Sequence, residues 1–168
     1  MHESLNINSA DTDIEKYKTI LSQLDHLINN EEPLISNLAN FTAVLKEAFE
    51  KISWVGFYFA TNKKLFLGPF QGKVACTVIE FGKGVCGTSA ERKETIIAED
   101  VEKFPGHIFC DGGSKSEIVV PLLKDDNAIG VLDLDSYKLS AFNETDKFYL
   151  ELLCKTLTQK LSFEKEVL

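Results

Sequence analysis

The spacing of apolar residues predicts two amphipathic helices in the first third of the chain. Over 12–28, apolar side chains recur every three or four positions, and Thr12 with Glu15 forms a capping-box sequence at the start. A second stripe of the same period covers 34–49. The polar residues 1–11 before the first helix are expected to form a flexible tail.

The pattern then changes to short aromatic and β-branched runs, which are typical of strands. Asn143 can cap one last amphipathic helix near the end of the chain. The predicted strands are 52–59 and 65–67 as a hairpin, 75–81, 95–97, and a second hairpin of 117–123 and 128–135. A glycine-rich bend at 82–87 leads into a short helix near 88–92, and 98–115 forms a long irregular loop.

The order of these elements indicates the fold class. A block of five or six strands lies between helices at the two ends, which predicts an α+β fold: a mostly antiparallel sheet with the terminal helices packed on one face. No repeat and no linker divides the sequence, so 1–168 is expected to be a single domain.

Composition and charge narrow the function classes. The chain is 44% apolar, and 18 basic against 26 acidic residues give a net charge of −8, which disfavours nucleic acid and anionic membrane surfaces as partners. No stretch has the length and hydropathy of a membrane span, and the amino terminus does not look like a signal peptide. A cytoplasmic protein is expected, whose four cysteines are thiols and not structural disulfides.

Three carboxylates are predicted to gather on one face of the sheet. Asp133 and Asp135 are two positions apart on a strand, so they point to the same side. If Lys124 pairs with Ala128 around the turn, Glu117 lies opposite Asp135. The pKa of one carboxyl should then rise unless a cation lies among them. Such a patch suits a general acid or a site for an ammonium group, although a solvated strand face would show the same alternation.

The cysteines leave several interpretations open. Cys86 lies at a predicted helix start, where backbone N–H groups favour a thiolate, and Cys110 lies in the long loop near His107. Each cysteine alone is more typical of a packing thiol, as expected for Cys154 on its helix. A zinc site of Cys76, Cys86, His107 and Cys110 is a further alternative, but the chain has no C-x-x-C pair.

Two aromatic residues are candidates for a pocket wall. Trp54 and Tyr58 are four positions apart on a predicted strand and therefore share a face. The glycine-rich bend 82–87 lacks the order of a nucleotide-binding loop.

Several motifs together resemble the free methionine-R-sulfoxide reductases, which are single-domain members of the GAF family. The resemblance covers the chain from the first predicted hairpin to the last strand. The matching segments are WVGFY at 54–58, GPFQG at 68–72, AC at 75–76, FGKGVCG at 81–87, FPGHI at 104–108, CD at 110–111, SEIVVPL at 116–122 and LDLDS at 132–136.

The resemblance implies a GAF-like fold with a six-stranded antiparallel sheet and assigns roles to the candidate residues. Cys110 would be the nucleophile, with Cys76 favoured over Cys86 as the thiol that resolves the sulfenic acid by forming a disulfide. The carboxylates Glu117, Asp133 and Asp135 and the aromatic residues Trp54 and Tyr58 would bind the substrate, and Glu117 is the candidate acid.

The resemblance also implies the reaction and its partners. Free methionine-R-sulfoxide would be reduced to methionine without a bound metal or cofactor, in antioxidant repair. Thioredoxin would then reopen the disulfide. It further suggests a homodimer through the amino-terminal helices. The main alternative is a non-catalytic GAF module that senses a small molecule, because the fold alone allows it.

Overall fold

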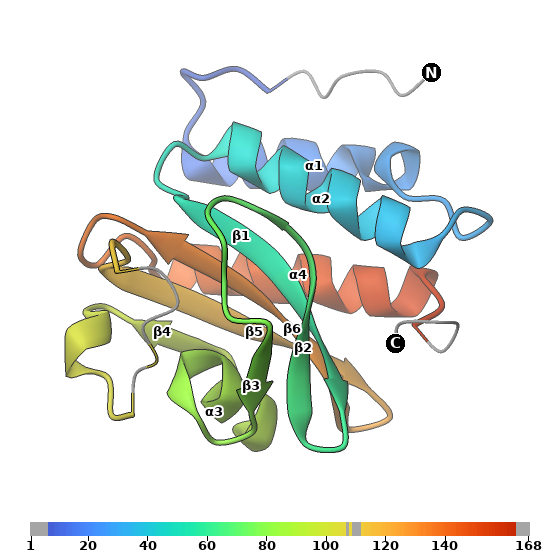
Figure 1. The fold of residues 1–168 in the computed structure, drawn as a ribbon. Coiled ribbons are helices and arrows are strands. Elements are labelled where there is room, and N and C mark those ends of the chain that lie inside the picture. The colour runs from blue at the N-terminus through green and yellow to red at the C-terminus, as the bar shows by residue number, and fades with distance from the viewer. Residues whose placement is uncertain (1–6, 107, 109–111, 164–168) are drawn as a thin grey trace.

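A six-stranded antiparallel sheet is the centre of the protein in a computed structural model, which describes residues 7–106, 108 and 112–163 (Figure 1). The strand order is β3-β2-β1-β6-β5-β4. The last strand, β6, therefore lies beside β1 at the middle of the sheet, and β5 lies between β6 and the edge strand β4. The strands are β1 (Trp54–Thr61), β2 (Lys64–Gln71), β3 (Val78–Glu80), β4 (Ile96–Ala98), β5 (Ser116–Lys124) and β6 (Asn127–Ser136).

The terminal helices cover one face of this sheet, as the sequence predicts. They are α1 (Asp13–Leu27), α2 (Leu34–Ala48) and α4 (Glu144–Lys160), whereas the short α3 (Gly84–Arg92) packs on the opposite face (Figure 1). No helix among the described residues is both long and apolar enough to span a bilayer. The expected α+β architecture is confirmed.

Capping boxes fix the starts of α1 and α4. The Thr12 hydroxyl accepts a hydrogen bond from the Glu15 backbone N–H, and the Glu15 carboxylate accepts one from the Thr12 N–H. Asn143 and Asp146 form the same reciprocal pair in α4. Not every apolar residue of the predicted helices is buried: Ile14 of α1 is 43% exposed and Phe148 of α4 is 61% exposed.

The alternation of side chains along each strand divides the interior into two cores. Ile118 on β5 and Leu132 on β6 face α1, α2 and α4, in the larger core. Their neighbours in sequence, Val119 and Val131, point to the opposite face of the sheet and pack with α3 in a smaller core. The smaller core is the one that contains the candidate site.

The β5–β6 hairpin has the predicted pairing of Glu117 with Asp135, but its turn differs from the prediction. Asp125 and Asp126, both with positive φ, form a two-residue turn, so Lys124 pairs with Asn127 and not with Ala128. A register shift at Leu122/Leu123 compensates for that difference, and Glu117 faces Asp135 as predicted.

Other details also differ from the prediction: β1 and β2 end at Thr61 and Gln71, beyond the predicted ends at 59 and 67. The third strand covers only Val78–Glu80, because the residues before it form an irregular segment. The short helix α3 begins at Gly84, inside the glycine-rich bend, where φ is +60°. The loop after β4 contains one turn of 3-10 helix, Val101–Lys103.

A buried ionic network joins the terminal helices to the entrance of β1. Nζ of Lys51 lies 2.7 Å from both Oδ2 of Asp13 and Oδ1 of Asp146, and the Tyr17 hydroxyl donates to the same Asp146 oxygen at 2.9 Å. The other oxygen, Oδ2, accepts from the Asn143 N–H. Asp146 is fully buried, so its charge depends on these partners.

We expect Asp146→Asn to destabilise the protein by about 2 to 4 kcal/mol, because it leaves Lys51 with one fewer buried counter-charge and Tyr17 with a weaker acceptor. Urea unfolding measures the loss. Asp25→Asn is the matched control, since it breaks the exposed pair with Lys160 and should change stability by less than about 0.5 kcal/mol. Equal effects of the two substitutions would contradict the assignment.

Candidate active site

Three carboxylates meet on the α3 face of the sheet. Asp133 and Asp135 lie two positions apart on β6, and Asp135 pairs across the sheet with Glu117 on β5 and with Trp54 on β1. All three carboxylates line one pocket. The central position of β6 therefore places acidic groups from two strands beside the aromatic residues of a third.

Two of the three carboxylates are buried, whereas Asp135 is partly exposed. Glu117 and Asp133 are each only 6% exposed. Of the described residues that line the pocket, none is Lys, Arg or His. Oδ1 of Asp133 is buried and makes no hydrogen bond. An orphaned carboxylate oxygen in a pocket marks the place where a ligand donor can bind.

Burial raises the pKa values of two of these carboxyls. For Glu117, loss of hydration is the largest cause, followed by the charges of Asp133 and Asp135, and its pKa lies well above the usual range. For Asp133, burial raises the pKa to about 7. A carboxyl pKa is raised as predicted, but burial is a larger cause than the crowding of like charges.

Cys86 belongs to this cluster, but not as a thiolate. It lies in the first turn of α3 and is 3% exposed, and its Sγ donates to Oε1 of Glu117 at 3.8 Å. Burial, followed by the charges of Asp133 and Glu117, raises its pKa well above that of a free thiol. Of the two interpretations that the sequence left open for Cys86, these contacts favour the packing thiol over the thiolate, because burial and the carboxylates outweigh the helix dipole.

Trp54 and Tyr58 form the aromatic wall of the pocket, on the face where the sequence places them. Their ring centroids are 6.1 Å apart, and Trp54 stacks on Phe70 of β2 at 5.5 Å. Gly56 between them is required, since a Cβ there would lie 2.4 Å from the Trp54 ring. The glycine lets the indole lie flat on β1.

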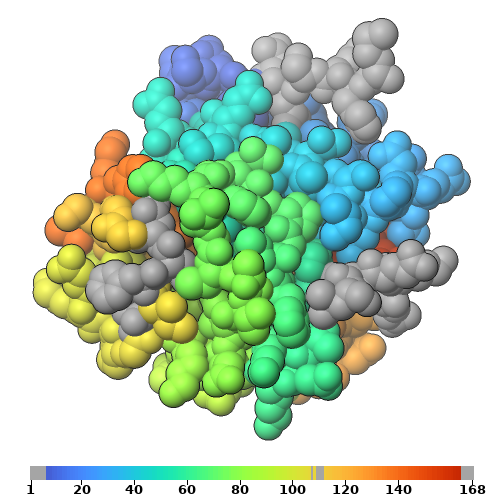
Figure 2. Space-filling model, viewed as in Figure 1, coloured from blue at the N-terminus to red at the C-terminus, as the bar shows by residue number. Residues whose placement is uncertain are grey.

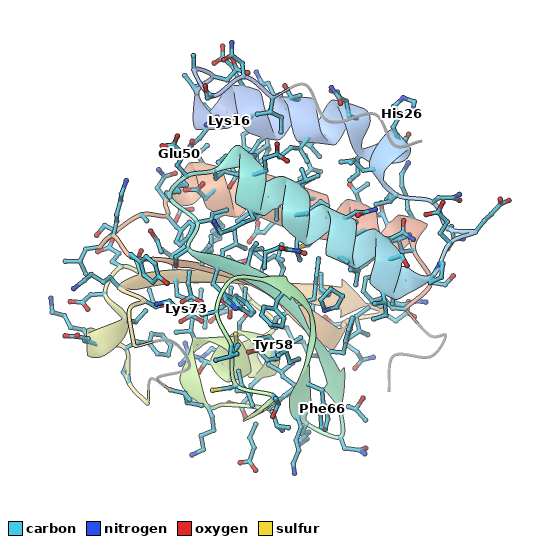
Figure 3. The ribbon with its side chains drawn as sticks, turned by 45° about the horizontal axis from the view of Figure 1, so that its top comes forward. Lys16, His26, Glu50, Tyr58, Phe66 and Lys73 are labelled. Carbon is cyan, nitrogen blue, oxygen red and sulfur yellow. The ribbon has the colours of Figure 1, made fainter. Side chains whose placement is uncertain are left out.

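The segment between β2 and β3, residues 72–77, crosses the pocket side of the molecule (Figures 1 and 2). Trp54 Nε1 donates to the Lys73 carbonyl at 3.0 Å, and the Tyr58 hydroxyl donates to the Cys76 carbonyl at 3.0 Å. Figure 3 shows Tyr58 and Lys73 in this region. We call this segment the strap.

The cysteines are in two chemical states. Cys76, on the strap, is disulfide-bonded, whereas Cys86 and Cys154 are free and buried. The sequence-based expectation of four thiols is thus wrong for Cys76. Cys154 packs in the larger core as predicted, where burial raises its pKa. Cys110 and His107 lie outside the described residues.

Several pocket residues were not predicted from the sequence. Ser114 has a buried hydroxyl with no hydrogen-bond partner, and Gly84 and Val85 bring the start of α3 to the pocket. Nothing in the sequence distinguishes Ser114 from the other loop residues. The remaining wall, which is apolar, consists of Val74, Ala75, Ile79 and Ile108.

The candidate zinc site of Cys76, Cys86, His107 and Cys110 lacks at least one of its thiol ligands. Cys76 in a disulfide cannot act as a thiolate ligand, and His107 and Cys110 lie outside the described residues. Among the described residues, one atom each of Cys86, Glu117 and Asp133 lie within 4.8 Å of one another. This arrangement suits a cationic donor such as an ammonium group, which can use the orphaned Asp133 oxygen.

Comparisons with known proteins agree with this geometry. A model of the GAF domain family matches residues 39–162. GAF domain-containing protein A of Dictyostelium discoideum is 51% identical over 94% of this chain and 99% of its own length. The free methionine-R-sulfoxide reductase of Saccharomyces cerevisiae is 42% identical, covering 89% of this chain and 88% of its own.

A solved structure gives the same result at the level of the fold. The X-ray structure of free methionine-R-sulfoxide reductase from Neisseria meningitidis, in complex with its substrate, superposes with a TM-score of 0.90. It is 45% identical and covers 95% of this chain and 95% of that chain. This chain belongs to the GAF domain family and, within it, to the group of the free methionine-R-sulfoxide reductases.

Proposed function

We propose that this protein reduces free methionine-R-sulfoxide to methionine with its own cysteines. The observation that carries the proposal is the pair of buried carboxyls, Glu117 and Asp133, with one Asp133 oxygen that makes no hydrogen bond, beside a strap that holds a disulfide-bonded cysteine. A relative with substrate bound and 45% identity supports the same substrate class. The outcome would be repair of oxidised methionine.

The carboxylates account for selectivity toward the free amino acid. An ammonium group placed among Glu117, Asp133 and Asp135 would donate to the orphaned Asp133 oxygen and neutralise part of the patch. A methionine sulfoxide within a polypeptide has an amide in place of the ammonium, so it would bring no positive charge to the unpaired Asp133 oxygen.

The carboxylate of the substrate needs a different partner from its ammonium group. Gly84 and Val85 expose the first turn of α3 to the pocket, and the Ser114 hydroxyl there is unpaired. Backbone N–H groups at a helix start and a free hydroxyl both suit a carboxylate. We assign the substrate carboxylate to this side.

Reduction itself would use one thiol and one proton. The Cys110 sulfur attacks the sulfoxide sulfur, and Glu117, which burial keeps protonated, gives its proton to the departing oxygen. The oxygen passes to the cysteine, so methionine leaves and a sulfenic acid remains. Condensation with a second thiol then forms a disulfide and releases water.

We infer that Cys76 is the second thiol. Cys76 lies on the strap and is disulfide-bonded, whereas Cys86 is a free, buried thiol that is hydrogen-bonded to Glu117. Turnover requires an external dithiol, for which thioredoxin is the expected reductant. That chemistry fits a reducing compartment such as the cytoplasm. A homodimer stays a prediction from the family resemblance.

The direct test is consumption of NADPH with thioredoxin and thioredoxin reductase. We expect turnover of free methionine-R-sulfoxide, no turnover of the S epimer, and none of a peptide-bound sulfoxide. Cys110→Ser should lose turnover by at least about a thousandfold while it still binds methionine, because the carboxylates remain.

Two further variants separate the roles of the other cysteines. Cys76→Ser should still release one methionine per chain but fail to turn over with thioredoxin, whereas Cys154→Ser, away from the pocket, should behave like the wild type. Binding of methionine by a wild-type protein that reduces no sulfoxide would contradict the proposal and favour the GAF sensor.

The raised pKa of Asp133 predicts how stability depends on pH. Since its pKa of about 7 lies above the unfolded value near 4, the folded state binds more protons between these pH values, and the free energy of unfolding falls as pH rises through this window. Asp133→Asn should flatten the profile and raise stability at pH 8 by about 1 to 3 kcal/mol.

Denaturant titrations from pH 5 to pH 8 measure this effect. Asp126→Asn is the matched control, because Asp126 is 93% exposed in the hairpin turn and should leave the pH profile unchanged. A profile of equal slope in the wild type and Asp133→Asn would show that Asp133 does not titrate in this window.

A further inference from the structure

The strap is held over the pocket by two side chains that start on β1. Between Gly72 and Thr77 the backbone belongs to no regular element, and Val74 at its middle is 87% exposed. The Thr77 carbonyl accepts a hydrogen bond from the Leu67 N–H at 3.0 Å, which fixes the far end of the strap to β2. The position of Cys76 therefore depends on contacts made by side chains.

Trp54 fixes the beginning of the strap. Gly72 adopts a φ of +135°, and a Cβ there would lie 2.5 Å from Cδ1 of the indole, so the strap starts in direct contact with the ring. One residue later, the Lys73 carbonyl accepts the hydrogen bond from Nε1. Phe70 and Gly56 hold the other side of the indole.

Tyr58 fixes the residue that carries the sulfur. Its ring lines the pocket at 1% exposure, and its hydroxyl donates to the Cys76 carbonyl at 3.0 Å. Burial and the nearby acidic groups raise the pKa of this hydroxyl, so it stays a donor. The ring of Tyr58 thus lines the pocket, while its hydroxyl binds the backbone carbonyl of Cys76.

We propose that Tyr58, assisted by Trp54, is a positioning residue for the disulfide-forming step, separate from its contact with substrate. This inference rests on the proposed function of Cys76. In that step the Cys76 sulfur bonds to the sulfenic sulfur of Cys110, the S–O bond breaks, and the hydroxyl leaves as water with the thiol proton. The hydrogen bond to the Cys76 carbonyl restricts the strap and raises the effective concentration of the attacking thiol.

Tyr58→Phe separates the two roles, because it keeps the ring on the pocket and removes the donor. Both rates are measured in the same variant, because Tyr58 also lines the substrate pocket and its substitution can alter methionine release; disulfide formation should fall by more than methionine release. Disulfide formation should be about threefold to tenfold slower, which is the range for one lost hydrogen bond to a neutral acceptor. The sulfenic acid should therefore accumulate.

A single-turnover experiment without reductant measures both steps. Methionine is quantified by chromatography, the sulfenic acid by dimedone trapping, and the disulfide by mass spectrometry. Tyr149→Phe is the matched control, because it removes the same atom from α4, away from the pocket, and should change neither rate. Trp54→Phe should slow disulfide formation in the same direction as Tyr58→Phe.

An equilibrium measurement tests the same positioning without substrate. In glutathione redox buffers, Tyr58→Phe should lower the equilibrium constant for the disulfide over the dithiol by about threefold to tenfold, since the freed strap reduces the effective concentration of Cys76. The Tyr149→Phe value should equal that of the wild type.

Two results would overturn the inference: wild-type values for both disulfide formation and the equilibrium constant in Tyr58→Phe, or an equal fall in methionine release and disulfide formation. Failure of the proposed function looks different, because the wild type itself would then release no methionine. The glutathione equilibrium would still report on the strap in that case.

Discussion

The burial of two neighbouring carboxyls, Glu117 and Asp133, is the constraint on which the site depends. Both are removed from water on interior strands of the sheet, and none of the described residues that line their pocket is Lys, Arg or His. Such a group must take up a proton or bind a cation to avoid a large loss of hydration energy. The raised pKa values are the first response, and an ammonium ligand would be the second.

The rest of the fold offsets the free-energy cost of burying these carboxyls. The larger core, which joins three helices to one face of the sheet, and the Asp146 network stabilise the scaffold on the side away from the pocket. The smaller core can therefore contain a neutral buried thiol, an orphaned carboxylate oxygen and an unpaired hydroxyl. Functional sites commonly concentrate such local costs.

Local chemistry explains which features the sequence could predict. Capping boxes and strand alternation act over a few residues, so the starts of α1 and α4 and the shared face of Trp54 and Tyr58 could be predicted. The pairing of Glu117 with Asp135 was predicted correctly only because a register shift offsets the different turn. Tertiary environment decided the rest. The helix start at Cys86 suggested a thiolate, but burial among carboxylates reverses that expectation. Contacts of the strap and the unpaired Ser114 hydroxyl have no signal in the sequence.

Proton release on ligand binding tests the central claim most directly. Calorimetry of methionine binding near pH 7, in two buffers of different ionisation enthalpy, counts the protons exchanged. If the ammonium binds beside Asp133, it stabilises the charged form of that carboxyl, whose pKa is about 7, and Asp133 releases a proton while Glu117 keeps its own for the reaction. Binding with no proton release, or with proton uptake, would show that the patch does not receive the ammonium and would contradict the account.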